Sequence, residues 1–264
     1  MEWYWIICLI AVGIVAGLLS GLIGISGGVI AVPSLLFILR YSGMPEEHLM
    51  HVAVSTSLSS MTFNSFSSMM AHHRRHGVVW DATLKMLPGL LLGSAAGALI
   101  AGLLASGVLE VVFGVFECAL GLYFLRALKQ KEDCHPLPSF ALLCAAAFLI
   151  SGIATILGIG GGLLVTPLLV FMGFKMRKAV GTAAASSFVV CLAGAISYLV
   201  LGLKSGDIIP DCIGFIHFPA FFCIILTAPF AAILGAYLTH TLPVNVIRRI
   251  FGLALILAGI AVIW

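Results

Sequence analysis

Two glycine clusters are the part of the sequence best suited to bind a ligand. Residues 24–28 read Gly-Ile-Ser-Gly-Gly and residues 158–162 read Gly-Ile-Gly-Gly-Gly, and a proline follows each cluster, at Pro33 and Pro167. Glycine allows backbone conformations that a helix cannot use, and proline removes a helical hydrogen bond. A helix that begins at such a break presents free N–H groups, which suit an anion. The alternative is that the glycines only allow helices to pack closely.

Polar side chains gather in the stretch that follows each cluster. Residues 55–68 contain ten hydroxyl or amide side chains, and residues 182–187 of the second half contain three. Ser and Thr can bond to the preceding helical turn, so a few of them would carry no information. Ser55, Thr56 and Ser59 share one helical face, with Asn64 further along it. We expect this face to line a polar path or to join helices by hydrogen bonds.

Two titratable residues are candidates for proton coupling. Glu117 lies in the middle of an apolar segment, where a carboxylate is costly and is usually functional or paired. It is either a proton-coupling group or a protonated hydrogen-bond donor. His217 is either a proton carrier or a structural histidine.

The remaining polar motifs point to no enzyme and no cofactor. His72, His73 and His76 surround two arginines, which is more typical of a basic helix end than of a metal site. The sequence contains no HExxH motif and no GxSxG motif, so no catalytic constellation is predicted.

The predicted substrate-binding residues are therefore the two clusters and the hydroxyl faces. They are Gly24, Ser26, Gly27, Gly28, Ser55, Thr56, Ser59, Asn64, Gly158, Gly160, Gly161, Gly162, Thr182, Ser186 and Ser187.

The amino-acid composition indicates which kind of secondary structure holds these residues in place. The chain of 264 residues is 62% hydrophobic and 9% charged, against about 25% charged in a soluble domain. This excludes a soluble enzyme and a nucleic-acid binder, and the unbroken apolar runs exclude a β-barrel. We expect an all-α polytopic membrane protein with apolar segments at 5–39, 49–71, 82–105, 107–125, 139–174, 179–203, 212–241 and 244–264.

The sequence contains an internal repeat. The second glycine cluster repeats the first, Ala-Val-Ser-Thr at 53–56 matches Ala-Val-Gly-Thr at 179–182, Pro88 matches Pro219, and Phe-Gly at 113–114 matches 251–252. The polar stretch 126–138 separates the halves. We therefore expect an N-terminal transmembrane repeat at 1–130 and a C-terminal one at 131–264, as in many transporters.

The first and fifth segments are too long for one crossing. Thirty-five helical residues span about 52 Å, against a hydrocarbon core of about 30 Å. Each is therefore predicted to be a broken helical hairpin that returns to its starting side, followed by three transmembrane helices; the alternative is one long tilted helix.

Charge counting favours the hairpins. With them, two cations, Arg40 and Lys204, lie on one side and eleven on the other. The eleven are Arg74, Arg75, Lys85, Arg126, Lys129, Lys131, Lys175, Arg177, Lys178, Arg248 and Arg249. This bias predicts that the eleven are cytoplasmic, that both termini are periplasmic or extracellular, and that the two repeats are inverted.

The duplicated glycine motif with its proline and the following Ala-Val-x-Thr resembles the sulfite exporter TauE/SafE family over nearly the whole chain. The resemblance implies a carrier of small sulfur-containing anions, such as sulfite or sulfoacetate, in the bacterial inner membrane. Ser26 stands where the second cluster has Gly160, so the two clusters differ at this position.

The sequence therefore predicts a secondary transporter of a small anion that works by alternating access. The alternatives are an anion channel, and a membrane-integral enzyme or assembly factor without flux. The expected partners are the substrate and the lipid bilayer.

Overall fold

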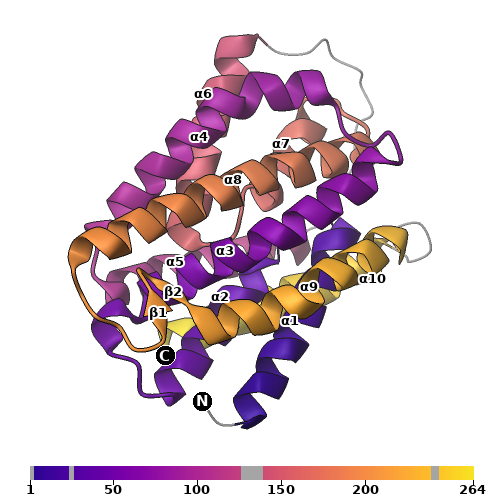
Figure 1. Cartoon of the computed structure of the whole chain (residues 1–264). Coiled ribbons are helices and arrows are strands. Elements are labelled where there is room, and N and C mark those ends of the chain that lie inside the picture. Colours follow the sequence, from indigo (N-terminus) through magenta and orange to yellow (C-terminus); the bar gives the residue numbers. More distant parts are fainter. Residues whose placement is uncertain (1–2, 24–26, 126–138, 239–243) are drawn as a thin grey trace.

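The computed structural model describes residues 3–23, 27–125, 139–238 and 244–264. The predicted site residues Gly24 and Ser26, and the predicted boundary between residues 130 and 131, lie outside the described residues. The described chain is a bundle of α-helices with one short β-hairpin (Figure 1). The helices of the first half are α1 (Trp3–Ile23), α2 (Gly28–Tyr41), α3 (Glu46–His73), α4 (Trp80–Gly102) and α5 (Ser106–Leu125). Those of the second half are α6 (Phe140–Leu157), α7 (Gly162–Phe171), α8 (Met176–Ser205), α9 (Phe218–Leu238) and α10 (Val244–Ile263).

The helices have the lengths and composition of a polytopic membrane protein. Six of them, α1, α4, α5, α6, α8 and α9, are long and apolar enough to cross a membrane. Many large apolar side chains on the outside of the bundle are exposed, including Leu92 and Phe230. An exposed apolar surface of this extent suits lipid rather than water.

Both long apolar segments are broken at their glycine clusters. The first segment forms α1 and α2, and the second forms α6 and α7. The α6 break follows from local backbone: Gly158 and Gly160 have φ angles of 70° and 60°, which a side chain disfavours. The shorter member of each pair has 14 residues in α2 and 10 in α7, or about 21 and 15 Å of helix, which is less than a bilayer core.

Glycine contacts give the relative directions of neighbouring helices. Between α5 and α10, Gly114 packs on Gly259 and Gly121 on Gly252, so these two helices run antiparallel. Helices α3 and α8 also run antiparallel, since Leu58 lies against Gly194 and Gly181 lies against the carbonyl of Gly77. Each of these pairs joins a helix of one half to the helix at the same place in the other half.

Two other pairs run parallel. Gly89 lies against Cys144 and Gly97 against Gly152, which aligns α4 with α6. Gly13 lies against Ile224, and Leu18 lies against Gly235, which aligns α1 with α9. With α3 antiparallel to α8 and α4 parallel to α6, the pair α6 and α7 must return the chain to the side on which it started.

A β-hairpin replaces the expected start of the seventh apolar segment. The sequence predicts an apolar stretch from residue 212, whereas α9 begins at Phe218. Strands β1 (Cys212–Ile213) and β2 (Ile216–His217) pair antiparallel in front of it. Asp211 and Gly214 have φ angles of 56° and 58°, which turn the chain and end helical geometry there.

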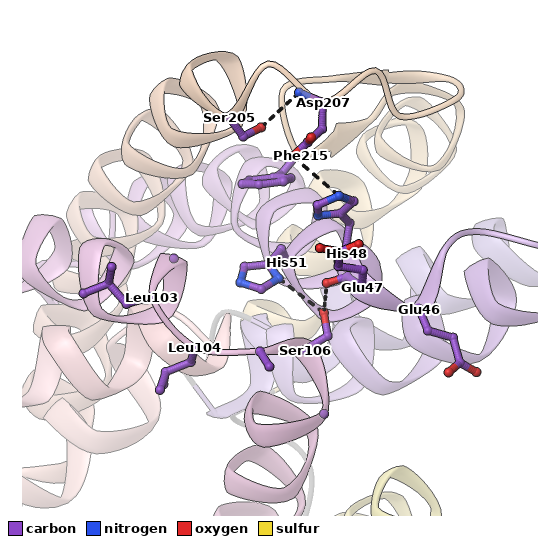
Figure 2. A pocket seen from close by; sticks show the side chains of 13 residues that line it. Glu46, Glu47, His48, His51, Leu103, Leu104, Ser106, Ser205, Asp207 and Phe215 are labelled. Carbon is purple, nitrogen blue, oxygen red and sulfur yellow. Dashed lines mark hydrogen bonds and ion pairs between the residues drawn. The ribbon is translucent and has the colours of Figure 1, made fainter.

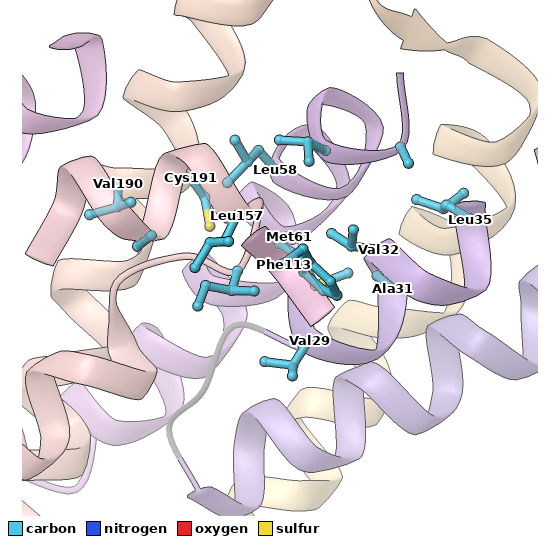
Figure 3. Packing of buried hydrophobic residues seen from close by; sticks show 14 of the residues in the cluster. Val29, Ala31, Val32, Leu35, Leu58, Met61, Phe113, Leu157, Val190 and Cys191 are labelled. Atoms are coloured by element: carbon cyan, nitrogen blue, oxygen red, sulfur yellow. The ribbon is translucent and has the colours of Figure 1, made fainter. Parts of the chain in front are cut away.

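The apolar core surrounds the glycine breaks. Val29 and Val32 of α2, Leu58 and Met61 of α3 and Val190 of α8 belong to one buried cluster (Figure 3). Phe113 of α5 and Leu157 of α6 belong to the same cluster. The breaks therefore lie in the protein interior, where water cannot satisfy their backbone groups.

Candidate functional site

The two glycine clusters touch each other. A Cβ placed on Gly28 would meet the carbonyl oxygen of Gly158, and would lie 2.8 Å from the Cα of Ile159. Only a residue without a side chain allows this approach of backbone to backbone. The hydroxyl of Ser57 donates to the same Gly158 carbonyl at 3.0 Å. The structure thus brings Gly28 against Gly158 and Ile159 of the second cluster, whereas Gly27 packs on Ala16 of α1.

The helices that begin at the two clusters carry no side-chain cap. Gly27 precedes α2 and Gly161 precedes α7, and neither can offer a side chain to the first N–H groups. The carbonyl of Gly27 accepts from Ile30 and Ala31, and that of Gly161 accepts from Leu164 and Val165.

The N–H groups of the first two residues in each of these helices have no acceptor within the described chain. These residues are Gly28, Val29, Gly162 and Leu163, and all four are buried. Buried N–H groups without a partner are costly, and an anion would satisfy them.

The backbone carbonyl group near the carboxyl end of α6 accepts two hydrogen bonds. The carbonyl of Thr155 accepts from the Gly158 N–H at 3.3 Å and from the hydroxyl of Tyr198 at 3.3 Å. Tyr198 comes from α8 and is fully buried. Ser57, Thr155 and Tyr198 are absent from the predicted site. Ser57 lies in the hydroxyl-rich run, while nothing local in the sequence points to Tyr198.

Most of the predicted hydroxyls are already bonded to the backbone. Ser59 donates to the carbonyl of Ser55 at 2.8 Å, and Ser186 donates to that of Thr182 at 3.1 Å. Both are bonds to the preceding turn of the same helix, which serine and threonine commonly make. Asn64 is buried and its amide donates to the sulfur of Met61 at 3.5 Å.

Two predicted hydroxyls remain without a partner in the described part of the chain. These are Ser55 on α3 and Ser187 on α8, and each side chain is buried. The hydroxyl of Thr155 also has no hydrogen-bond partner in the described part of the chain. Val54, the neighbour of Ser55, packs on Gly158, and Val190, one turn after Ser187, faces Gly161. Ser55 and Ser187 are therefore the predicted hydroxyls that lack a partner in the described chain and can bond a ligand.

Thr56 and Thr182 make equivalent contacts with the other half of the chain. The hydroxyl oxygen of Thr56 accepts from the backbone N–H of His217, just before α9, at 2.9 Å. That of Thr182 accepts from the N–H of Val79, just before α4, at 3.0 Å. Each hydroxyl keeps its own proton free to donate.

Glu117 is fully buried on α5. Both of its carboxylate oxygens lack a hydrogen-bond partner in the described part of the chain. It lies between Gly114 and Gly121, the two glycines that pack against α10. A carboxyl group in such surroundings is held more readily as the neutral acid than as the anion.

The His217 ring has a structural contact. Its Nδ1 accepts from the backbone N–H of Ala220 at 3.3 Å, in the first turn of α9. Burial lowers the pKa of His217, while the charge of Asp211 acts in the opposite direction. A proton on Nδ1 would remove the acceptor of Ala220, so this contact requires the neutral ring.

The described residues contain no group of three or more His, Cys, Asp or Glu side chains placed to hold a metal ion. At the basic end of α3, the Nδ1 of His73 accepts from the indole N–H of Trp80 at 3.2 Å. The polar groups described at the glycine breaks are backbone groups and hydroxyls, set within the apolar core.

Comparison with known proteins identifies relatives over nearly the whole chain. The family model for sulfite exporter TauE/SafE matches residues 9–262. A probable membrane transporter protein of Haemophilus influenzae is 30% identical over 264 residues, covering 98% of both chains. A probable membrane transporter protein of Bacillus subtilis is 26% identical, covering 98% of this chain and 97% of its own. No solved structure matches the chain.

Proposed function

The chain belongs to the sulfite exporter TauE/SafE family of membrane proteins, and from this premise we propose that it is a secondary carrier of a small sulfur-containing anion. The family name and the names of the relatives indicate a membrane transporter rather than an enzyme. We further propose that the carrier works by alternating access and that its transport is coupled to protons.

One observation carries the proposal: two helices without side-chain caps begin at the glycine breaks in the interior of the bundle, and the start of α2 contacts the second break. Gly28 begins α2 and packs against Gly158, four residues before the start of α7. Their first amides, which have no acceptor among the described residues, supply donors for an anion without a buried positive charge. A carrier benefits from this arrangement, because a buried lysine or arginine would hold the anion too strongly for release.

The hydroxyls of Ser55 and Ser187 add donors to the same site. Both are buried and unpartnered in the described chain, and they come from α3 and α8, the two long helices at the centre of the bundle. The contact between Gly28 and Gly158 leaves no space for an anion. The site must therefore open when substrate binds, and we assign the closed arrangement to a substrate-free state.

Alternating access requires two halves that exchange roles. Helices α3 and α8 run antiparallel, as do α5 and α10, while α4 lies parallel to α6 and α1 to α9. A two-fold axis in the membrane plane relates helices in this manner, which supports an inverted repeat. We propose that rocking of the halves separates the clusters first toward one side and then toward the other.

We propose that Glu117 carries the coupled proton. Its carboxyl group is buried and unpartnered among the described residues, whereas the His217 ring caps α9 as an acceptor. A neutral acid in the apolar interior can release its proton when the bundle opens to water.

Uptake into proteoliposomes tests the substrate assignment. Labelled sulfite is offered with an excess of unlabelled sulfite, thiosulfate, sulfoacetate or sulfate. The proposal expects saturable uptake that at least one of the sulfur anions inhibits, and chloride at the same concentration serves as control. Uptake that does not saturate, or that no sulfur anion inhibits, would contradict it.

A further inference from the structure

A polar pocket lies at the end of the bundle where α3 begins (Figure 2). It has a volume of about 510 Å³ and is formed by the first turns of α3, the α4–α5 connection and the chain after α8. Its polar lining includes His48, His51, Ser106 and Asp207. The charge count predicts that this end is the outer side, because Lys204 and Arg40 lie there.

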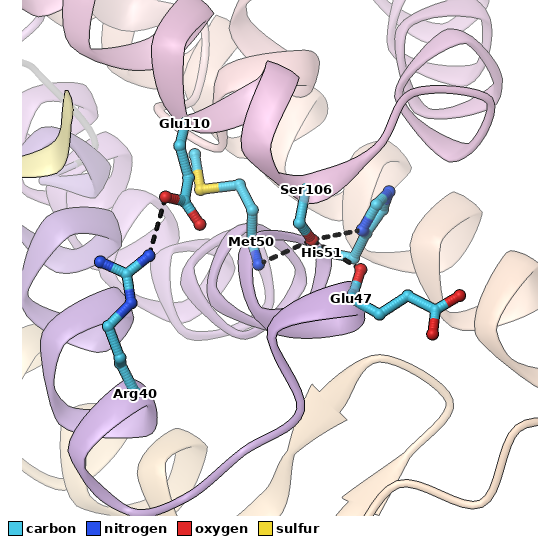
Figure 4. Close-up of polar contacts among 6 residues, drawn as sticks. All are labelled: Arg40, Glu47, Met50, His51, Ser106 and Glu110. Carbon is cyan, nitrogen blue, oxygen red and sulfur yellow. Dashed lines mark hydrogen bonds and ion pairs between the residues drawn. The ribbon is translucent and has the colours of Figure 1, made fainter. Parts of the chain in front are cut away.

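The His51 ring is bonded at both nitrogens. Its Nε2 lies 3.0 Å from the carbonyl oxygen of Ala101, and its Nδ1 lies 3.3 Å from the hydroxyl oxygen of Ser106 (Figures 2 and 4). A carbonyl oxygen can only accept, so Nε2 carries a proton.

The bonds of Ser106 determine the state of the second nitrogen. The Ser106 hydroxyl donates its proton to the carbonyl of Glu47 at 2.7 Å, and its oxygen accepts from the Met50 N–H at 3.3 Å (Figure 4). Having one proton, Ser106 cannot also donate to Nδ1. In this arrangement Nδ1 can bond to Ser106 only as a donor, and a ring with hydrogens on both nitrogens is the charged imidazolium. If Ser106 donates to the ring instead, Nδ1 accepts and the ring is neutral.

From this donor count we infer that His51 is a proton-binding site that exchanges its proton with the pocket. The proton-binding site itself is inferred from the hydrogen bonds alone. Its role in coupling rests on the proposed proton-coupled transport. In the charged state, Ser106 bonds to Glu47. When His51 loses its Nδ1 proton, the Ser106 hydroxyl can turn and donate to the ring, so both states are fully bonded.

Three acidic side chains and one other histidine line the pocket around His51. Helix α3 contributes Glu46 and Glu47, and the chain after α8 contributes Asp207. His48 is the one other titratable cation on the pocket lining among the described residues, and its Nε2 lies 3.5 Å from a carboxylate oxygen of Asp207.

The other elements packed here contribute no further charge to the pocket. The part of the α4–α5 connection that lines it, residues 102–107, has no titratable side chain. The ring of Phe215 packs against His51 at a centroid distance of 5.5 Å. Glu110, on the next turn of α5, is paired with Arg40 at 2.8 Å.

The location of His51 links the pocket to the proposed coupling residue. Ser106 is the first residue of α5, the helix that carries Glu117 three turns later. The proton on His51 decides whether Ser106 bonds to α3 or to the ring. Binding of a proton from the pocket at His51 therefore changes a hydrogen bond at the start of α5.

Two measurements test this site. In wild-type protein with ¹⁵N-labelled histidine, the signal that disappears in His51→Gln should show both nitrogens protonated at low pH and lose one proton as the pH rises. A signal that keeps one protonation state from pH 4 to pH 9 would overturn the inference. This titration needs no transport, so it is separate from the test of the proposed function.

The second measurement compares variants in proteoliposomes. Anion accumulation driven by a pH gradient should fall about tenfold in His51→Gln, while exchange of anion without a gradient stays within about twofold of wild type. His48→Gln, on the same pocket, is the control and should retain accumulation. Normal accumulation in His51→Gln, or equal loss of exchange and accumulation in the folded variant, would overturn the coupling role.

Discussion

The hydroxyl oxygen of Thr56 accepts a hydrogen bond from the backbone N–H of His217 at 2.9 Å. In the other half, Thr182 accepts from the N–H of Val79 at 3.0 Å. Each threonine lies in the long central helix of one half and holds the residue that precedes a helix of the other half. The two hydrogen bonds therefore join the halves at two places.

The first prediction concerns these two threonines. Replacing Thr56 or Thr182 by valine keeps the shape and removes the acceptor of a backbone N–H, which costs about 1–3 kcal/mol when the donor is buried. Both variants should lower the thermal unfolding temperature in detergent, and the matched Thr→Ser variants should restore most of it. A valine variant as stable as wild type would show that its hydrogen bond contributes nothing.

The second prediction concerns Gly161, whose φ angle of −66° any residue can adopt. A Cβ there would lie 3.0 Å from Cγ2 of Val190, so the added atoms of valine would crowd α8 at the start of α7. Gly161→Val should fold and lose transport about tenfold or more. The control Gly107→Val places the same side chain where nothing lies within 4 Å, and should transport normally. Wild-type flux in Gly161→Val would place the substrate elsewhere.

The third prediction separates coupling from binding at Glu117. Glu117→Gln mimics the protonated acid and cannot release a proton. The variant should therefore exchange anion across the membrane, yet fail to accumulate it in response to a pH gradient. Normal accumulation would leave Glu117 with a structural role or none.

The fourth prediction concerns topology. Single cysteines at Arg74 and Lys175 should react only with a reagent applied from the cytoplasmic side, and one at Lys204 only from the outside. The background is a cysteine-free variant. Labelling of Arg74 and Lys175 from opposite sides would exclude the predicted return of α6 and α7.

Much of the helical framework could be predicted from the sequence, because glycine clusters and long apolar runs are local signals. Helix α1 ends at Ile23 and α2 begins at Gly28, and α6 ends at Leu157 and α7 begins at Gly162, so both ends and starts lie at the glycine clusters. The hairpin at residues 212–217 could not be predicted, since its apolar residues continue into α9 and hide the turn at Gly214.

The contacts of the site depend on residues far apart in the sequence. Ser57 meets Gly158, and Tyr198 meets Thr155, through the packing of α3, α6 and α8. The sequence shows that these helices carry hydroxyl groups, but the partners of each hydroxyl depend on how the helices pack. Ser59 and Ser186 bond to their own helices. Ser55 and Ser187 have no partner in the described chain.

The helix contacts also revise one sequence match. Val79 and His217 have the same separation as Gly97 and Gly235, and both pairs make equivalent contacts. Pro88 and Pro219 have a different separation. The two prolines are therefore not at equivalent positions in α4 and α9, although both helices contain a proline.

Counterflow is the measurement that tests the central claim most directly. Proteoliposomes are loaded with unlabelled sulfite, thiosulfate or sulfoacetate and diluted into a trace of the labelled anion without any ion gradient. A carrier that exposes one closed site alternately to each side should accumulate label transiently above its equilibrium level, and Gly161→Val should abolish this overshoot. Equilibration without an overshoot for every sulfur anion would contradict the carrier mechanism and favour a channel or a protein without flux.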